Sequence, residues 1–119
     1  TKPMAPAVRK AYVAPYDSWA NRIAIHRFVQ DIPLAQGDPA WATVQRVAAA
    51  LPAICAAPTM IVWGRKDFVF NDAFLAEWRR RVPDARYLVF DDAGHFVLED
   101  AHAEIVPAVA AFLASEASA

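Results

Sequence analysis

The sequence has a single cysteine, no excess of either charge and no long hydrophobic run, and each absence excludes a class of protein. Cys55 alone can form neither an intrachain disulfide nor a thiolate zinc cluster, and a reducing cytoplasm is its natural compartment. The 12 basic and 13 acidic residues give a net charge of −1, which offers no positive field to a nucleic acid or an anionic membrane. No apolar run approaches the length of a membrane span. We therefore expect a soluble, cytoplasmic protein without a nucleic-acid or membrane partner.

Apolar residues are abundant enough for the core of one small domain, since 57% of the 119 residues are hydrophobic. Three prolines within residues 1–16 predict an extended or irregular lead-in, because proline disfavours helix at the residue before it. Two helices are expected next, over residues 17–29 and 39–51, the second with Asp38 as its N-cap. The first part of the chain is therefore predicted to be a connection followed by two helices.

From residue 59 onward the pattern alternates between strands and helices. Residues 59–63 and 86–90 are short apolar runs, typical of strands covered on both faces of a parallel sheet. Residues 72–82 and 101–113 predict helices, with Pro107 as a kink in the second or as its true start. The first of these helices should begin at Asn71 or Asp72. Four of its apolar side chains are expected to point inward: Phe74, Leu75, Trp78 and Val82.

The predicted order is β-α-β-α, which gives an α/β fold with one parallel pair of strands. Two parallel strands cannot cover both of their faces alone. We therefore expect the remaining strands to come from polypeptide outside these 119 residues, most simply an N-terminal portion of the same protein. The high apolar content agrees with a surface that pairs with such a portion.

An acid and a histidine occupy matching places beyond the two predicted strands. Asp67 lies four residues past the first strand, and His95 lies five past the second. Because ligands in open α/β sheets bind beyond the carboxyl ends of the strands, both side chains should meet at that edge within hydrogen-bond reach. A carboxylate beside an imidazole fixes the ring tautomer and makes the histidine a competent base. Without a partner, a histidine after a strand and a glycine is more often a structural turn.

Several motifs carry a resemblance to a known family. WGRKD, VPDARYLVFDDAGH and the final AAFL look like the C-terminal end of the α/β-hydrolase fold, and the separation of 28 positions from Asp67 to His95 fits its triad acid and histidine. APYDSWANRIAIHRFVQDIPL, WGRKDFVF and DAGHFVLED are similar to haloalkane-dehalogenase-like hydrolases, which include the β-lactone decarboxylases of bacterial olefin synthesis. The resemblance implies that residues 1–33 are the end of a cap domain with its return helix. Residues 34–119 would be the C-terminal part of the hydrolase core, with its last two strands.

The resemblance also implies roles for particular residues. Asp67 would be the triad acid and His95 the general base, while Phe96 and Phe68 or Val69 would line a pocket for a small apolar substrate. No cofactor or metal would be needed. The 119 residues contain no G-x-S-x-G or equivalent nucleophile elbow. The nucleophile, an aspartate or a serine, would therefore come from the N-terminal half of the same hydrolase, as a separate or cleaved chain.

Several functions remain open at this point. The first expectation is hydrolysis of a haloalkane-like substrate, and the alternatives within the fold are a β-lactone decarboxylase, an esterase and an epoxide hydrolase. A hypothesis outside enzyme function is that the chain is a non-catalytic half that only assembles with a partner. His26 and His102 are expected on helix surfaces or partly buried, and with His95 they show no metal-ligand spacing.

Overall fold

The computed structural model describes residues 2–116 and divides into two compact units. Residues 52–116 with residues 2–3 form what we call the sheet unit, and residues 4–51 form the helical unit. None of the helices within the described range has the length and apolarity that a membrane crossing requires. The regions predicted as cap end and core, 1–33 and 34–119, include residue 1 and residues 117–119, which lie outside this range. The assignment to a cap domain stays a prediction.

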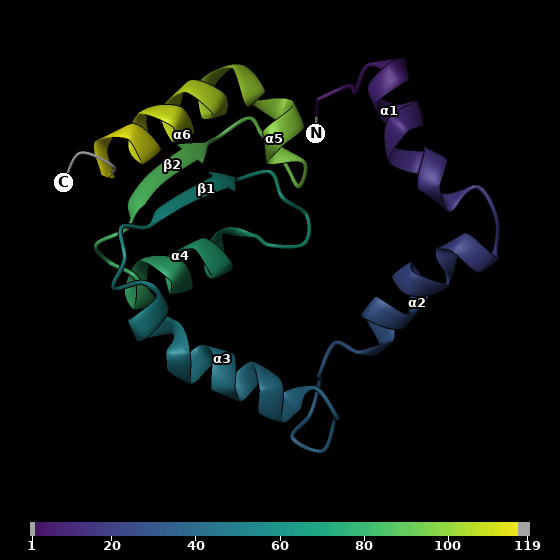
Figure 1. The fold of residues 1–119 in the computed structure, drawn as a ribbon, viewed down its shortest axis with the longest axis horizontal. Helices are drawn as coiled ribbons and strands as arrows, with labels where there is room; N and C mark the ends of the chain where they lie inside the picture. Colours follow the sequence, from purple (N-terminus) through teal and green to yellow (C-terminus); the bar gives the residue numbers. More distant parts are fainter. Residues whose placement is uncertain (1, 117–119) are drawn as a thin grey trace. The chain divides into compact units, whose positions relative to one another are not determined.

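The sheet unit is built on two parallel strands, β1 (Met60–Gly64) and β2 (Arg86–Phe90), which are joined through α4 (Asp72–Arg81) (Figure 1). The register pairs Met60 with Arg86 and Gly64 with Phe90. The predicted second strand is confirmed, and the first begins and ends one residue later than predicted. Both strands consequently end side by side at one edge.

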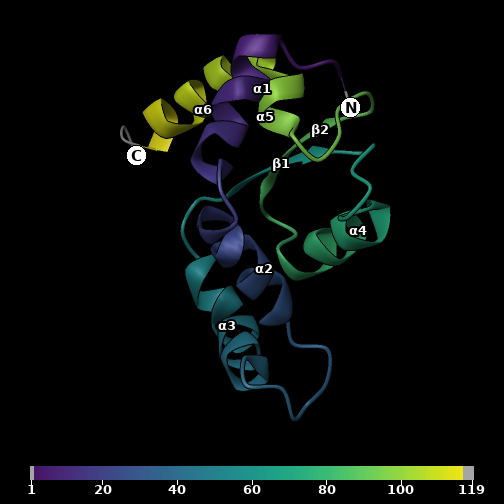
Figure 2. The same ribbon diagram turned by 90° about the vertical axis from the view of Figure 1, so that its right-hand side faces the viewer.

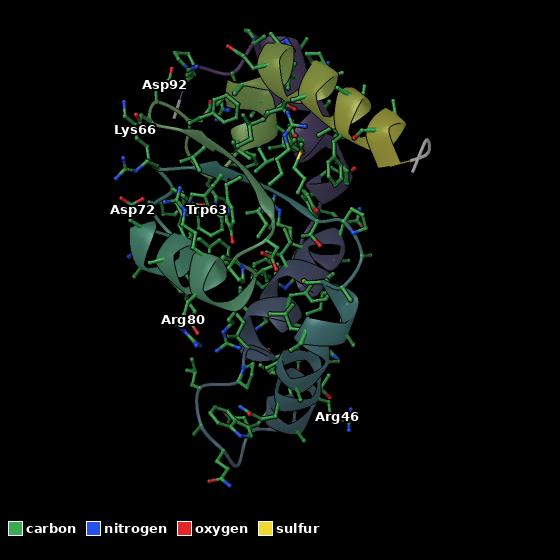
Figure 3. The ribbon with its side chains drawn as sticks, turned by 90° about the vertical axis from the view of Figure 1, so that its left-hand side faces the viewer. Arg46, Trp63, Lys66, Asp72, Arg80 and Asp92 are labelled. Carbon is green, nitrogen blue, oxygen red and sulfur yellow. The ribbon has the colours of Figure 1, made fainter. Side chains whose placement is uncertain are left out.

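Helices cover the two faces of the sheet differently. α5 (Val97–Asp100) and α6 (His102–Glu116) lie on one face and α4 on the other, as both ribbon views show (Figures 1 and 2). Trp63 of β1 lies on the face toward α4 (Figure 3). The buried centre is on the α6 side, where the strands alternate their side chains as a pleated sheet requires. It consists of Ala93, Ala101 and Ile105, packed against Val62, Leu88, Phe90, Val97 and Val109.

α4 confirms most of its prediction. The Asn71 side chain caps it by accepting a hydrogen bond from the Ala73 amide at 3.0 Å. Leu75 and Val82 are buried, but the prediction that Phe74 points inward is wrong, because this residue is 48% exposed. Phe74 instead packs edge-on against Phe70, with the ring centroids 5.3 Å apart.

The C-terminal helix is also confirmed, with Pro107 inside α6 rather than at its start. α5 was not predicted, because its four residues are too few to show a helical period.

The helical unit contains short helices joined by turns. The prediction of an extended lead-in is wrong for residues 6–13, which form a helix with Pro6 at its first position, where the missing amide costs no hydrogen bond. The elements in chain order are α1 (Pro6–Val13), η1 (Ala14–Tyr16), η2 (Ala20–Arg22), α2 (Ile23–Gln30) and α3 (Trp41–Ile54), the last of which runs into the sheet unit.

The two helices predicted for this unit are present with different bounds. The first is a 3-10 turn followed by α2. The second begins at Trp41 instead of residue 39 and continues through Pro52 to Ile54. Asp38 does not cap it as predicted, because its Oδ2 accepts hydrogen bonds from the preceding amides of Leu34 and Ala35 at 2.7 and 2.8 Å. Asp38 therefore closes the turn that leads into the helix.

Candidate active site

The loops that follow β1 and β2 are joined by backbone hydrogen bonds at the carboxyl edge of the sheet. The Arg65 amide donates to the Phe90 carbonyl at 2.9 Å, and the Lys66 amide donates to the Ala93 carbonyl at 2.8 Å. Figure 3 shows Lys66 and Asp92, one from each loop, at this edge of the sheet unit. The two loops therefore have a fixed spacing, which matters for any side chains they carry.

Gly64 makes this close approach possible. A Cβ atom at Gly64 would lie 2.5 Å from the Gly94 carbonyl oxygen and 2.7 Å from that of Ala93. Both neighbours are backbone atoms and cannot rotate away, so any side chain here would force the loops apart. Glycine at the end of β1 thus sets the separation between the loop that carries Asp67 and the loop that carries His95.

Asp67 is held by the backbone of its own loop. Its Oδ1 accepts hydrogen bonds from the amides of Val69 and Phe70 at 2.7 and 3.0 Å. Burial raises the pKa of the Asp67 carboxyl. Hydrogen bonds from the Phe70 amide, the His95 ring and the Val69 amide lower it, and together they outweigh the effect of burial. The net pKa lies below the ordinary value of an aspartate, so the group is a carboxylate at neutral pH.

The side chains of Asp67 and His95 meet, as the sequence predicted. His95 Nδ1 lies 2.9 Å from Asp67 Oδ2 and 3.0 Å from Oδ1. The Asp67 side chain is 11% exposed and that of His95 34% exposed, so the acid is the more buried of the two. An ionised carboxylate can only accept a hydrogen bond, so Nδ1 carries the proton and donates it in the bond to Asp67. Nε2 is then the nitrogen that can face a substrate.

Three aromatic rings surround the imidazole. The centroid of the His95 ring lies 5.5 Å from Phe68, 5.8 Å from Phe70 and 5.7 Å from Phe96. Phe68 and Phe96 were predicted to line a substrate pocket, which stays a prediction, and Phe70, whose ring also lies next to His95, was not predicted. Its place three residues after Asp67 is the sequence signal that could have identified it. In the structure, its amide also binds the Asp67 carboxylate.

The third predicted lining residue, Val69, is 43% exposed. Its backbone amide donates a hydrogen bond to Asp67 Oδ1.

The histidine loop is tethered from its far side as well. The Gly94 amide donates to Asp100 Oδ2 at 2.7 Å, and the Lys2 amide donates to Asp100 Oδ1 at 2.9 Å. The Lys2 ammonium also lies 2.8 Å from Asp92 Oδ2. Residues near the beginning of the chain therefore bind the loop that carries His95.

Arg65 links the acid loop to two other segments. Its guanidinium pairs with Asp72 at the start of α4 at 2.6 Å and with Asp91 after β2 at 3.1 Å. Hydrogen bonds with Asp72 and then Asp91 raise the pKa of Arg65 above its ordinary value. The loop between β1 and α4 is thus fixed at Arg65, two residues before Asp67.

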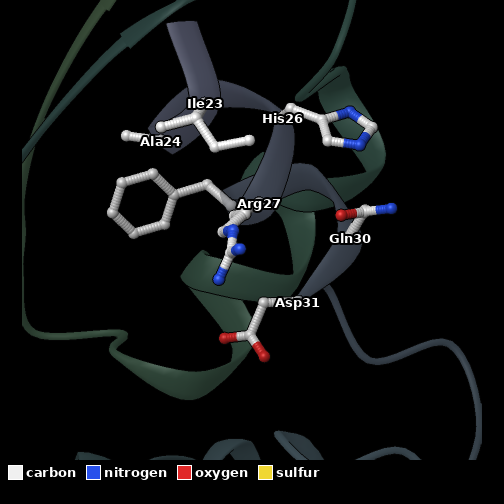
Figure 4. Close-up of a pocket in the computed structure, with 7 residues that line it drawn as sticks. Ile23, Ala24, His26, Arg27, Gln30 and Asp31 are labelled. Atoms are coloured by element: carbon white, nitrogen blue, oxygen red, sulfur yellow. The ribbon is translucent and has the colours of Figure 1, made fainter. Parts of the chain in front are cut away.

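The other histidines lie elsewhere. His26 belongs to α2, where side chains between Ile23 and Asp31 line an open depression (Figure 4). All of these side chains come from one short segment, so no second element brings groups toward them. His102 begins α6. Within residues 2–116, no group of three His, Cys, Asp or Glu side chains is arranged to hold a metal ion.

Comparison with known proteins gives consistent matches. Residues 6–102 match the family model described as the alpha/beta hydrolase fold. The chain is 54% identical over 110 residues to a cis-3-alkyl-4-alkyloxetan-2-one decarboxylase of Xanthomonas campestris pv. campestris. It is 48% identical over 112 residues to a protein of the same name from Shewanella oneidensis. These alignments cover 92% and 94% of this chain but only 37% and 35% of the relatives. The chain therefore spans about a third of the length of the curated relatives it matches.

Proposed function

Because the chain belongs to the α/β-hydrolase fold family, we propose that Asp67 and His95 are the acid and the histidine of a nucleophilic active site. We further propose that the site decarboxylates a cis-3-alkyl-4-alkyloxetan-2-one, a β-lactone. The hydrogen bond of 2.9 Å between His95 Nδ1 and Asp67 Oδ2 carries the first part. Identities of 54% and 48% to proteins named for this reaction support the second.

The two side chains divide the work. Asp67, held by two backbone amides, orients the imidazole through Nδ1 and stabilises the imidazolium when the ring is protonated. His95 then presents Nε2 to the reacting groups, where it can hold or move a proton. Phe68, Phe70 and Phe96 would supply an apolar wall for the alkyl chains of the lactone.

The proposed site needs a nucleophile from outside this sequence, because the 119 residues contain no nucleophile elbow. We propose that the N-terminal half of the hydrolase carries it, as part of the same polypeptide or as a separate chain, and completes the sheet beyond β1 and β2. The nucleophile is an aspartate or a serine. The cytoplasmic location expected from the single cysteine also stays a prediction.

The decarboxylation balances without water, metal or redox partner. The ring bond between O1 and C4 and the bond between C2 and C3 both break, which releases CO2 and leaves a double bond between C3 and C4. A nucleophile that attacks C4 opens the ring to a carboxylate, whose charge a protonated His95 can stabilise. Loss of CO2 then supplies the electron pair that forms the alkene and expels the nucleophile.

Hydrolysis of a haloalkane, an ester or an epoxide would use the same pair differently. His95 would act as a base toward water, which would release the covalent intermediate. The product therefore distinguishes the two chemistries. Decarboxylation of the lactone gives an alkene and CO2, whereas hydrolysis of the same lactone gives a β-hydroxy acid.

The test combines the chain with its nucleophile-bearing portion and supplies a cis-3,4-dialkyl-oxetan-2-one. We expect alkene and CO2 in equal amounts by mass spectrometry, and a loss on the order of 10²–10⁴-fold in rate for His95→Gln and for Asp67→Asn. His102→Gln is the matched control and should retain the full rate, because this ring stands at the start of α6. A β-hydroxy acid or haloalkane turnover instead of alkene would replace decarboxylation with hydrolysis. Undiminished turnover by His95→Gln would end the catalytic assignment and leave a half that only assembles.

A further inference from the structure

The segment that carries His95 is closed by a side chain six residues beyond Gly94. Asp100, the last residue of α5, turns its carboxylate back so that Oδ2 accepts the Gly94 amide at 2.7 Å. Oδ1 of the same carboxylate accepts the Lys2 amide at 2.9 Å, and the Lys2 ammonium donates to the Asp100 carbonyl at 2.9 Å. His95 therefore stands in a short loop whose two ends are joined through one carboxylate.

Gly94 is held on both of its sides. Its carbonyl oxygen lies against Gly64, where a Cβ would approach to 2.5 Å, and its amide is bound by Asp100. The preceding residue, Ala93, is fully buried, and its carbonyl accepts the Lys66 amide at 2.8 Å. Contact with Gly64 of β1 thus limits movement of the Gly94 backbone toward the sheet. The hydrogen bond to Asp100 holds the Gly94 amide, directly before His95.

We propose that Asp100 is a positioning residue for His95, which it acts on through the Gly94 amide. The inference rests on the role proposed above for His95. A hydrogen bond from an amide to an ionised carboxylate is stronger than one to a neutral acceptor, and a distance of 2.7 Å is at the short end of its range. The imidazole must reach a carboxylate 2.9 Å away, so a shift of the Gly94 backbone moves the ring relative to Asp67.

The ionisation state of Asp100 agrees with this role. Burial raises the pKa of its carboxyl, hydrogen bonds from the Gly94 and Lys2 amides lower it, and the net pKa is below the ordinary value of an aspartate. The group is consequently an anion at neutral pH, with acceptor oxygens for both amides. From the sequence alone, Asp100 is one of several acids near a helix start, and its bond back to Gly94 is visible only in the fold.

The first measurement does not depend on turnover. In 15N-labelled protein, Asp100→Ala should speed hydrogen exchange of the Gly94 amide by about ten-fold or more. It should also weaken the His95 Nδ1–H resonance. Asp100→Asn, which keeps a carbonyl acceptor, should restore most of both signals. Asp92→Ala is the matched control, because Asp92 binds the Lys2 ammonium on the same loop at 2.8 Å without binding the Gly94 amide.

The second measurement is kinetic. With the β-lactone as substrate, Asp100→Ala should lower kcat on the order of 10- to 100-fold and leave KM almost unchanged, because a misplaced imidazole affects the reaction more than binding. Asp100→Asn should recover most of kcat, and Asp92→Ala should lower kcat far less than Asp100→Ala, because Asp92 binds the Lys2 ammonium and not the Gly94 amide. If Asp100→Ala does not fold, Asp100→Ser provides the same test, since it also removes the carboxylate that binds the Gly94 amide but keeps a polar side chain at the end of α5.

The outcomes separate this inference from the proposed function. Unchanged Gly94 exchange and an unchanged His95 resonance in Asp100→Ala or Asp100→Ser would overturn the positioning role, whatever the activity. If both signals respond as expected but the unmodified protein makes no alkene from the lactone, the proposed reaction fails and the positioning role stands.

Discussion

The sheet unit has five buried apolar residues, three of them in one cluster on the α6 side of the sheet, whereas none of residues 4–51 in the helical unit is buried. Large side chains of the helical unit remain exposed, among them Trp19 at 82% and Phe28 at 75%. Both units have amphipathic helices, but only the sheet unit has a second layer to receive an apolar face. A helical period in a sequence thus indicates which face needs cover, and only the fold shows whether that cover is present.

Matched isoleucines give the largest expected difference between the units. Ile105 of α6 is 2% exposed, and Ile25 of α2 is 46% exposed. Ile105→Ala should lower the free energy of unfolding by about 2–5 kcal/mol through the cavity it leaves, and Ile25→Ala by less than about 0.5 kcal/mol. Urea unfolding followed by circular dichroism measures both. Equal losses of unfolding free energy in the two variants would show that α2 is packed as tightly as α6. A larger loss for Ile25→Ala only when the nucleophile-bearing portion is present would show that this portion covers α2.

Matched glycines give the next largest effect. Gly64→Ala places a Cβ 2.5 Å from the Gly94 carbonyl oxygen, whereas nothing lies within 4 Å of a Cβ at Gly37 in the helical unit. We expect Gly64→Ala to lower the free energy of unfolding by about 1–3 kcal/mol and to weaken the contact between Asp67 and His95. Gly37→Ala should be neutral or slightly stabilising. Thermal unfolding of the two variants side by side decides the point, and a well-folded Gly64→Ala protein with full stability would refute the close approach.

Asp38 in the helical unit and Asp67 in the sheet unit both have a pKa lowered by loop amides, and these two should respond differently to a change at His95. The Ala35 and Leu34 amides lower the pKa of Asp38, while the pKa of Asp67 also depends on the His95 ring. His95→Ala should therefore raise the pKa of Asp67 and leave that of Asp38 unchanged. NMR titration of the two carboxyl groups measures this directly, and parallel behaviour would argue against a specific bond between Asp67 and His95.

The same shift fixes the sign of the acid response. The pKa of Asp67 is lower in the folded state than its ordinary value of 3.8, so its stabilising contribution is complete above that value. The contribution is lost as the pH falls through the folded-state pKa. Unfolding curves of Asp67→Asn, which lacks the titrating group, should show a weaker loss of stability in this acid range.

The smallest expected effect comes from the surface of α4. Hydrogen bonds from Arg80 and Arg81 lower the pKa of Glu77 to about 2. Its contribution should be present above pH 4.5 and decline as the pH falls toward about 2. Because the pairs are exposed, Glu77→Gln should have little effect, and that effect should shrink further in 1 M salt through screening. Chemical unfolding at two salt concentrations measures it, and a salt-independent loss would show that Glu77 acts through packing.

The elements that the sequence predicted well are those with a clear period and clear ends. β2 is bounded by Pro83 and the acidic turn after Phe90, and α4 begins at a good N-cap in Asn71. The meeting of Asp67 with His95 also followed from the sequence, because neighbouring parallel strands end at the same edge. Proline was misleading in α1, since its effect depends on whether it stands at the first helical position or later.

The supporting contacts of the site could not be predicted in the same way. The role of Gly64 depends on the distance between two backbones, which is a property of sheet packing and not of the residues nearby. The bond from Asp100 to Gly94 joins residues too far apart for a capping rule, and Lys2 comes from the other end of the chain. Phe74 is exposed and packs edge-on against Phe70, a contact from outside α4 that no helical pattern contains.

The tautomer of His95 shows whether Asp67 orients the ring. If it does, the proton of the neutral ring sits on Nδ1 and points at Asp67, and Nε2 is unprotonated and available to the substrate. Nitrogen chemical shifts of the labelled ring distinguish the two nitrogens. We predict the Nδ1–H form in the unmodified protein and a mixture of tautomers in Asp67→Ala. A neutral ring protonated on Nε2 in the unmodified protein would show that Asp67 does not orient His95 through Nδ1.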